Sequence, residues 1–192
     1  MNISPPNSEA FTKAQESVLS LLVELQQRDT IPALTFTDPW GSLVASSAKH
    51  IETRSWATPY RGPLAIHIAK TLPAEAEMRC DEEPFRQALE AAGYGWTAGL
   101  SHNAWQLPLG CVVALVRLEQ VQRISPGFRV DEQERAYGNY TPGRFAWQFS
   151  QVYRLREPLP ARGSLGVWRW TPPARLWEEI QARLDAERAE VI

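Results

Sequence analysis

Residues 34–70 read LTFTDPWGSLVASSAKHIETRSWATPYRGPLAIHIAK, and this stretch decides which fold we expect. The short run Ala33–Thr37 is rich in apolar residues and threonine, which predicts a strand. Asp38 then offers an N-cap and Pro39 suits the first helical position, so a helix is expected to continue to about Ala48. A strand, a turn and a helix thus precede the polar residues that follow.

The polar residues lie in a second predicted strand, Lys49–Trp56. Since alternate residues of a strand point to the same face, Glu52 and Arg54 share one face of it. Tyr60–Pro63 is typical of a turn, and Leu64–Ala69 predicts a further strand. The turn brings the chain back, so the two strands present their side chains near one another.

The rest of the chain contains mostly strands, with helical segments between them and no internal repeat. The expected elements are a helical insertion at about 72–103 with its clearest helix at Glu83–Ala92, a strand at Cys111–Val121, a surface loop at Arg129–Arg144, strands at about Phe145–Leu155 and Gly166–Trp170, and a helix from Pro173 to about Glu187. This order indicates an α+β domain around a partly closed β-barrel with flanking helices.

An amphipathic helix is predicted near the N-terminus, at Ser8–Arg28. Its apolar residues recur at mixed three- and four-residue spacing after a Pro-Pro start. Such an apolar stripe has to be buried. It packs on the domain that follows, or it binds a protein partner and makes the protein an interaction adaptor.

Composition limits the classes of function. The 192 residues suit one domain with extensions, and a net charge of −2 provides no overall positive field, so any nucleic-acid site has to be local. Cys80 and Cys111 lack metal-finger spacing and make no disulfide framework, which favours a reducing cytoplasm. The opening MNISPPNSEAFTK lacks signal-peptide features and no apolar run is long enough to span a bilayer, so a membrane protein is not expected. No pattern indicates a metal or another cofactor.

Residues 34–70 resemble the core of the ASCH family, whose signature is a GxKxxExR motif after a short helix. Lys49, Glu52 and Arg54 match it, and Ser47 stands where the motif has glycine. The downstream segments YGNYTPGRFAWQF and PARGSLGVWRW resemble the C-terminal half of bacterial members. The resemblance divides the chain into an N-terminal helical extension (1–31), an ASCH domain with the insertion (32–171) and a C-terminal helix (172–192).

The resemblance implies a PUA-like β-barrel with a ligand cleft near the motif. The PUA-like superfamily includes modules that recognise RNA or modified bases. Some small ASCH proteins are amidohydrolases acting on acylated cytidine, and others are described as nucleases or as nucleic-acid-binding parts of transcription coactivators. The resemblance therefore implies a nucleotide-like or nucleic-acid ligand without deciding an activity.

Lys49 and Arg54 are expected to donate to phosphate or base acceptors, while Glu52 orients them or accepts from an exocyclic amine. The alternative is a plain surface ion pair of Glu52 with either cation, which contributes about 0–1 kcal/mol. Further candidates for the same cleft are Arg61, His67 and Lys70 as polar groups, and Trp40, Trp56 and Tyr60 as rings that stack on a base. Arg144 is expected to be a loop charge, with closure over a bound anion as the alternative.

Whether the protein is an enzyme stays open from sequence. A lysine acts as a base only if its pKa is lowered, and Glu52 three residues from Lys49 keeps a lysine charged. The amidohydrolase branch has a threonine where Glu52 stands, and Thr53 is expected on the opposite face. Lys49 and Glu52 remain candidates to activate water. The first hypothesis is a binding module for RNA, single-stranded nucleic acid or a modified nucleotide; a small hydrolase and a protein-interaction adaptor are the alternatives.

Overall fold

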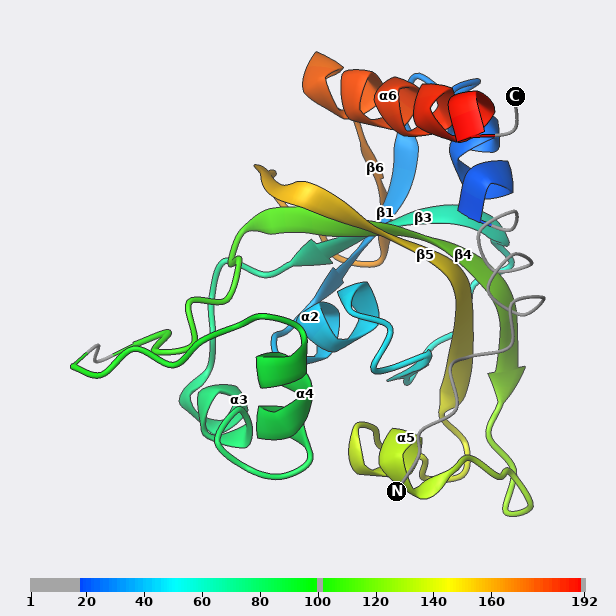
Figure 1. Ribbon diagram of the computed structural model, residues 1–192. Coiled ribbons are helices and arrows are strands. Elements are labelled where there is room, and N and C mark those ends of the chain that lie inside the picture. The colour runs from blue at the N-terminus through cyan, green and yellow to red at the C-terminus, as the bar shows by residue number, and fades with distance from the viewer. Residues whose placement is uncertain (1–17, 100–101, 191–192) are drawn as a thin grey trace, which may run out of the picture.

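A computed structural model of the protein describes residues 18–99 and 102–190, and it has the expected α+β class (Figure 1). A helix covers residues 18–25. The remaining elements are β1 (Ile31–Phe36), α2 (Trp40–Ala45), β2 (Ile51–Arg54), β3 (Gly62–Ile68), α3 (Ala74–Arg79), α4 (Phe85–Ala91), β4 (Cys111–Arg123), α5 (Glu132–Ala136), β5 (Phe145–Pro160), β6 (Val167–Trp170) and α6 (Ala174–Glu190).

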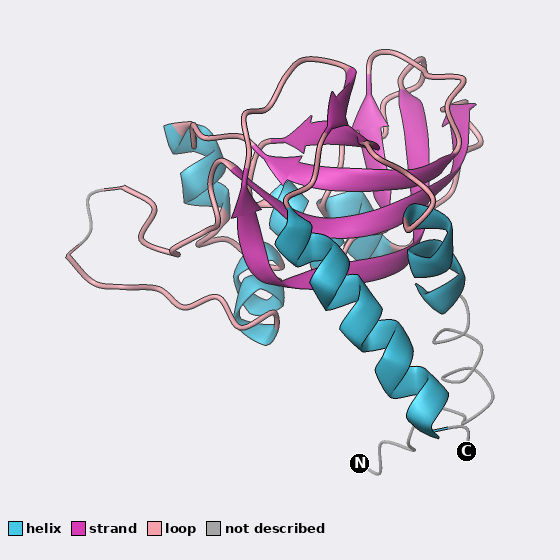
Figure 2. Ribbon diagram, turned by 90° about the horizontal axis from the view of Figure 1, so that it is seen from above, coloured by secondary structure: helices cyan, strands magenta, loops and turns pink. Residues whose placement is uncertain are grey.

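The strands form one six-stranded sheet in the order β2-β5-β4-β3-β1-β6. Only β1 and β3 run parallel; the other neighbours are antiparallel. α6 and the helix at 18–25 cover one face of the sheet, and α2 to α5 lie on the other (Figures 1 and 2). We expected a partly closed barrel, but β2 and β6 remain separate edges, and no pairing within the described residues closes the sheet. The long strands β4 and β5 curl instead, with register shifts along their ladder, and irregular pairing of this kind bends a sheet without closing it.

Apolar side chains fill both faces of the sheet. On one face the helix at 18–25 and α6 form a common apolar core. It contains the fully buried residues Leu21, Leu22 and Leu25 of the first helix and Leu176 and Ile180 of α6. Most of the apolar residues of the described part of this helix are therefore buried within the chain, although Val23 is 48% exposed. The expected first half of the helix, up to residue 17, lies outside the described residues.

On the other face, α2 packs into the concave side of the sheet, and the insertion builds a small core of its own around Phe85, Leu89 and Trp105. Leu43 of α2 belongs to that second core, so the insertion is anchored to the domain. α4 ends close to the expected residue, with Gly93 just beyond it at a positive φ of 84°, which suits glycine. Among the described residues, no helix is long and apolar enough to cross a membrane.

Candidate functional site

A cleft of about 1620 Å³ is lined by residues of α3 and α4 and by residues at the end of α5. Its floor is formed by the ends of β1 and β3, and the loop at residues 160–166 borders it. Five of the sequence-predicted residues line this cleft: Trp40, Glu52, Arg54, His67 and Lys70. The other four, Lys49, Trp56, Tyr60 and Arg61, are not among its lining residues.

The turn after α2 sets the position of the motif. The backbone N–H groups of Ser47 and Ala48 donate to the carbonyls of Val44 and Leu43, both at 3.0 Å, which is the Schellman arrangement of a helix C-terminus. Ser47 occupies the residue with φ of +61°, a conformation that normally favours glycine. The motif that this stretch resembles has glycine at this position, and here serine adopts the turn. α2 consequently ends at Ala45, three residues earlier than expected.

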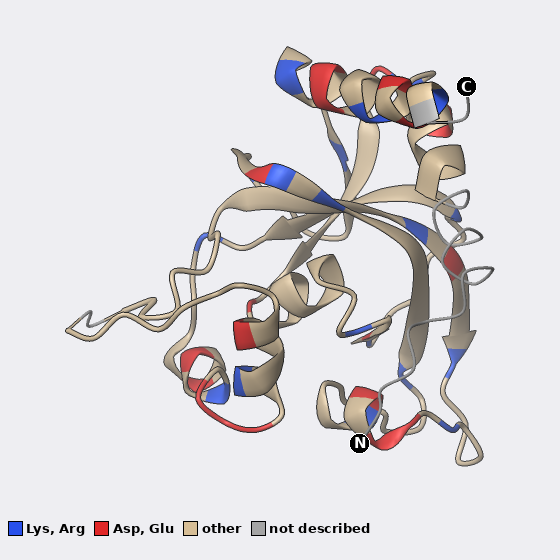
Figure 3. Ribbon diagram, viewed as in Figure 1, with Lys and Arg blue, Asp and Glu red and all other residues tan. Residues whose placement is uncertain are grey.

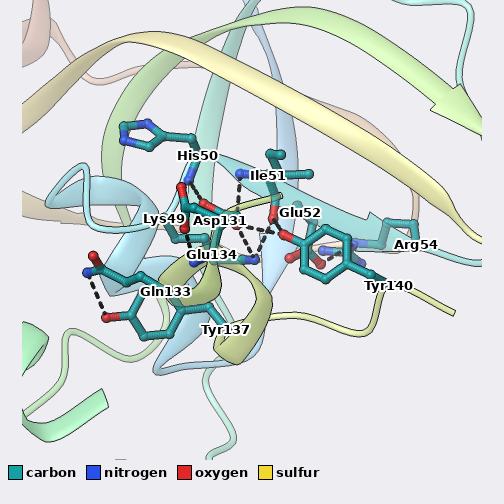
Figure 4. Close-up of polar contacts among 10 residues, drawn as sticks. All are labelled: Lys49, His50, Ile51, Glu52, Arg54, Asp131, Gln133, Glu134, Tyr137 and Tyr140. Carbon is teal, nitrogen blue, oxygen red and sulfur yellow. Dashed lines mark hydrogen bonds and ion pairs between the residues drawn. The ribbon is translucent and has the colours of Figure 1, made fainter. Parts of the chain in front are cut away.

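Lys49 is fully buried, which corrects the expectation that it faces the ligand cleft. Its Nζ donates to the Ile51 carbonyl and lies 3.2 Å from Glu134 Oε1 (Figure 4). The Glu134 carboxylate also accepts from the His50 backbone N–H at 2.8 Å and from the Tyr140 hydroxyl at 2.7 Å. One buried carboxylate thus ties the start of β2 to the segment around α5.

α5 lies within Arg129–Arg144, which sequence reasoning assigned to a loop. The Asp131 side chain accepts from the Glu134 backbone N–H at 2.7 Å and caps the helix. An Asp three residues before a Glu is a helix-start signal that could have identified α5, although not the partner of Glu134. Burial and the Glu134 carboxylate raise the pKa of Tyr140, so its hydroxyl stays protonated and donates.

Arg54 and Glu52 both line the cleft and pair with each other, as expected of residues on one face of β2, although Thr53 between them also borders the cleft. Arg54 Nε lies 2.9 Å from Glu52 Oε1, an ion pair without hydrogen-bond geometry, and the terminal nitrogen Nη2 donates to the Thr35 carbonyl at 2.7 Å. The guanidinium also sits 5.2 Å from the centre of the Phe36 ring. These contacts hold Glu52 and Arg54 as a fixed pair at the cleft.

Arg144 lines the cleft, so its assignment as a plain loop charge is wrong. Its Nη2 donates to the Thr53 carbonyl at 2.9 Å, while its Nε is buried without a hydrogen-bond partner in the part of the chain that the structure describes. A buried donor of this kind favours an acceptor nearby. Arg54 on β2 and Arg144, which precedes β5 and bonds to the Thr53 carbonyl of β2, thus both line the same side of the cleft.

His67 belongs to the cleft wall. Its ring lies between the Thr35 hydroxyl at 3.2 Å and the Ala161 carbonyl at 3.1 Å, and burial lowers the pKa of the imidazole. The loop passes so close that a Cβ on Gly163 would lie 2.4 Å from His67 Cε1. Both ring nitrogens of His67 thus have partners within the chain, and the side chain holds the loop at residues 160–166 in place.

The remaining predicted residues serve the scaffold. Arg61 is exposed and donates to the carbonyls of Thr58, Tyr60 and Val121, so the expectation that it approaches the cleft is wrong. Tyr60 donates to the Pro63 carbonyl, and Trp56 packs edge-on against Trp147 with ring centres 4.7 Å apart. Of the three predicted aromatic residues, only Trp40 borders the cleft, where its ring lies edge-on to Phe85.

The cleft concentrates positive charge. Its lining includes five basic side chains, Arg54, Lys70, Arg79, Arg144 and Arg162, and a single carboxylate, Glu52. Lys and Arg elsewhere alternate with Asp and Glu, on α6 for example (Figure 3). Within the described residues, no group of three or more His, Cys, Asp and Glu side chains gathers as it would around a metal ion. The cleft is thus a local basic site on a slightly acidic chain.

Comparison with protein families places this geometry in context. The model of the family described as "ASCH domain" matches residues 34–158, which runs from the second half of β1 through most of β5 and includes Lys49, Glu52 and Arg54. Comparison with curated proteins found no match.

Proposed function

The chain belongs to the ASCH domain family, and on this basis we propose that its cleft binds RNA or another single-stranded nucleic acid. The observation that carries the proposal is the charge of the cleft: five basic side chains against one carboxylate, in a chain whose net charge is −2. Basic groups that gather locally against the overall charge favour an anionic ligand. The family's association with nucleic-acid binding makes that ligand a polynucleotide.

The size of the cleft supports a short strand over one small molecule. At about 1620 Å³ it is larger than the roughly 300–1000 Å³ of ordinary small-molecule sites. Two of its cations, Lys70 and Arg162, are exposed and make no ion pair or side-chain hydrogen bond among the described residues. They are free to bind phosphates, while the half-buried ring of Trp40 offers contact area to a base. We propose that the curled, open sheet is a variant of the PUA-like fold that the family implies.

The two alternatives have less support. A hydrolase that uses Lys49 requires its amino group to reach the substrate, but this group is enclosed and paired with Glu134. An adaptor that uses the N-terminal helix requires a free apolar stripe, but Leu21, Leu22 and Leu25 are buried inside the domain.

Fluorescence anisotropy with labelled 12-nucleotide RNA and DNA strands, their duplexes and mononucleotides tests the proposal. Single strands are expected to bind best. Because at most five cations contact phosphates, the logarithm of affinity against the logarithm of salt should have a slope no steeper than about −3.5, at about 0.7 per phosphate.

Lys70→Ala and Arg162→Ala should each weaken binding and reduce the steepness of the slope by about 0.7. Arg156→Ala is the matched control, because this exposed arginine of β5 lies outside the cleft lining. Binding that is insensitive to both cleft variants, or equally sensitive to the control, places the nucleic acid elsewhere and rejects the proposal.

A further inference from the structure

We propose that Glu52 makes the cleft selective for unpaired bases that carry an amino group, namely cytosine, adenine and guanine, over uracil and thymine. This inference rests on the proposed function and deepens it, because it specifies which strands the same cleft prefers.

Glu52 differs from every other acidic residue of the described chain in its position at the cleft. It is the only carboxylate that lines the cleft, among five basic side chains. A purely phosphate-binding cleft gains nothing from an acidic lining residue, since a carboxylate repels phosphate. A carboxylate accepts hydrogen bonds and donates none, so its natural counterpart in a nucleic acid is a donor on a base.

One carboxylate oxygen is available for that donor. Oε1 lies 2.9 Å from Arg54 Nε, and no donor among the described residues makes a hydrogen bond to Oε2. The Glu52 side chain retains 14% of its exposure, so it can be reached from the cleft but is sheltered from most water. A hydrogen bond made in such a place is stronger than one made in open solvent.

The direction of Glu52 is fixed through Arg54. The guanidinium is anchored to the Thr35 carbonyl at 2.7 Å and lies against the Phe36 ring, so the ion pair has little freedom to turn away. A fixed acceptor distinguishes between ligands better than a mobile one, because a mismatched group cannot be accommodated by a small rotation.

The pairing edges of the bases differ at the relevant atoms. Cytosine has the N4 amino group, adenine the N6 amino group, and guanine the N2 amino group beside N1–H. Uracil and thymine present carbonyl oxygens around one N3–H, and their lone pairs face a carboxylate unfavourably. These edges are free only in unpaired bases, which agrees with a site for single strands.

Selectivity and overall affinity should therefore be separable. Lys70 and Arg162 contact phosphates, which are the same in every sequence, whereas Glu52 contacts bases. Changes at the two cations alter the affinity for all strands alike, and a change at Glu52 alters the ranking.

The test compares 12-nucleotide oligo-C, oligo-A and oligo-U RNA by anisotropy at one fixed salt concentration. The unmodified protein is expected to bind oligo-C and oligo-A about tenfold more tightly than oligo-U. Glu52→Gln places an amide that both donates and accepts at the same position, so the ratio should fall close to one while the salt slope stays the same. Glu157→Gln removes an equal charge from an exposed residue of β5 outside the cleft lining and should keep the ratio.

Each outcome has a distinct meaning. Equal binding of oligo-C and oligo-U by the unmodified protein overturns the role of Glu52 but leaves the proposed function intact, whereas no binding of any strand rejects the proposed function itself. A preference that persists in Glu52→Gln with an unchanged melting curve also overturns it. If Glu52→Gln does not fold, Glu52→Asp replaces it, since the shorter carboxylate withdraws from the cleft and should likewise reduce the ratio.

Discussion

Arg54 donates a 2.7 Å hydrogen bond to the carbonyl of Thr35 and so joins β2 to β1, although three strands separate them in the sheet. The two strands meet because the sheet curls, and a side chain spans the gap that the backbone ladder leaves open. Arg54, which links the two ends of the curled sheet, thus also pairs with Glu52 at the cleft. In this protein the arginine of the KxxExR motif connects the architecture to the cleft.

Replacing Arg54 should therefore affect both stability and binding. Arg54→Ala removes a charged hydrogen bond, a ring contact and an ion pair, and should lower the free energy of unfolding by about 1.5–3 kcal/mol. Arg54→Lys keeps the charge but not the planar fork, so it should recover only part of the loss. Urea unfolding measures both variants. An Arg54→Lys variant as stable as the unmodified protein would contradict the proposed bridging geometry.

The buried pair of Lys49 and Glu134 should behave as one unit. Lys49→Met leaves the carboxylate buried without its cation and should cost about 3–5 kcal/mol of stability. Adding Glu134→Gln removes the stranded charge, so the double variant should be more stable than the sum of the two single losses by about 0.5–3 kcal/mol. Urea unfolding of the four proteins measures this coupling. Strictly additive losses would show that the pair contributes no specific interaction.

Ser47 offers a stabilising substitution. At its φ of +61° an L-residue is disfavoured, so Ser47→Gly should raise the free energy of unfolding by about 0.5–1 kcal/mol. Ser46 is the matched control, because its φ is −92° and its hydroxyl donates to the Leu43 carbonyl. Ser46→Gly should instead lower stability. Thermal melting of both variants decides the matter, and a loss in Ser47→Gly refutes the prediction.

Asp38 predicts a pH dependence of stability. Burial raises the pKa of its carboxyl from 3.8 to about 6, because desolvation outweighs the hydrogen bonds from Ser42. The folded state then holds a proton that the unfolded state releases, so the contribution of Asp38 to stability is fully present below about pH 3.8 and is lost as the pH rises through about 6. The loss is on the order of 3 kcal/mol.

Asp38→Asn should remove that dependence. The difference in unfolding free energy between the unmodified protein and Asp38→Asn, measured by urea unfolding at several pH values, should change between pH 4 and 6 and level off on either side. Asp29→Asn alters an exposed residue and should give a flat difference curve. A flat curve for Asp38→Asn would show that the Asp38 carboxyl does not retain its proton in this range.

Much of the local structure could be predicted from the sequence. α2 begins directly after Asp38 and Pro39, although its N-cap is Pro39 and not Asp38 as expected. The period-two alternation predicted that Glu52 and Arg54 share a face, where they form an ion pair, and the apolar run from Cys111 indicated a central strand. These signals succeed because caps, turns and alternation depend on residues close together in the chain. The motif together with its flanking residues in 34–70 and two downstream segments indicated the family that the comparison then established.

Only the tertiary structure decided the role of each motif residue. Lys49 and Glu134 stand 85 residues apart, and nothing near Lys49 in the chain reveals that α5 covers it and turns an expected ligand-binding lysine into a buried ion pair. Arg144, expected as a loop charge, likewise reaches the cleft through the pairing of β5 with β2. Sequence periodicity determines which side chains share a face, whereas the element that packs over that face is selected by the burial of apolar surface across the whole domain.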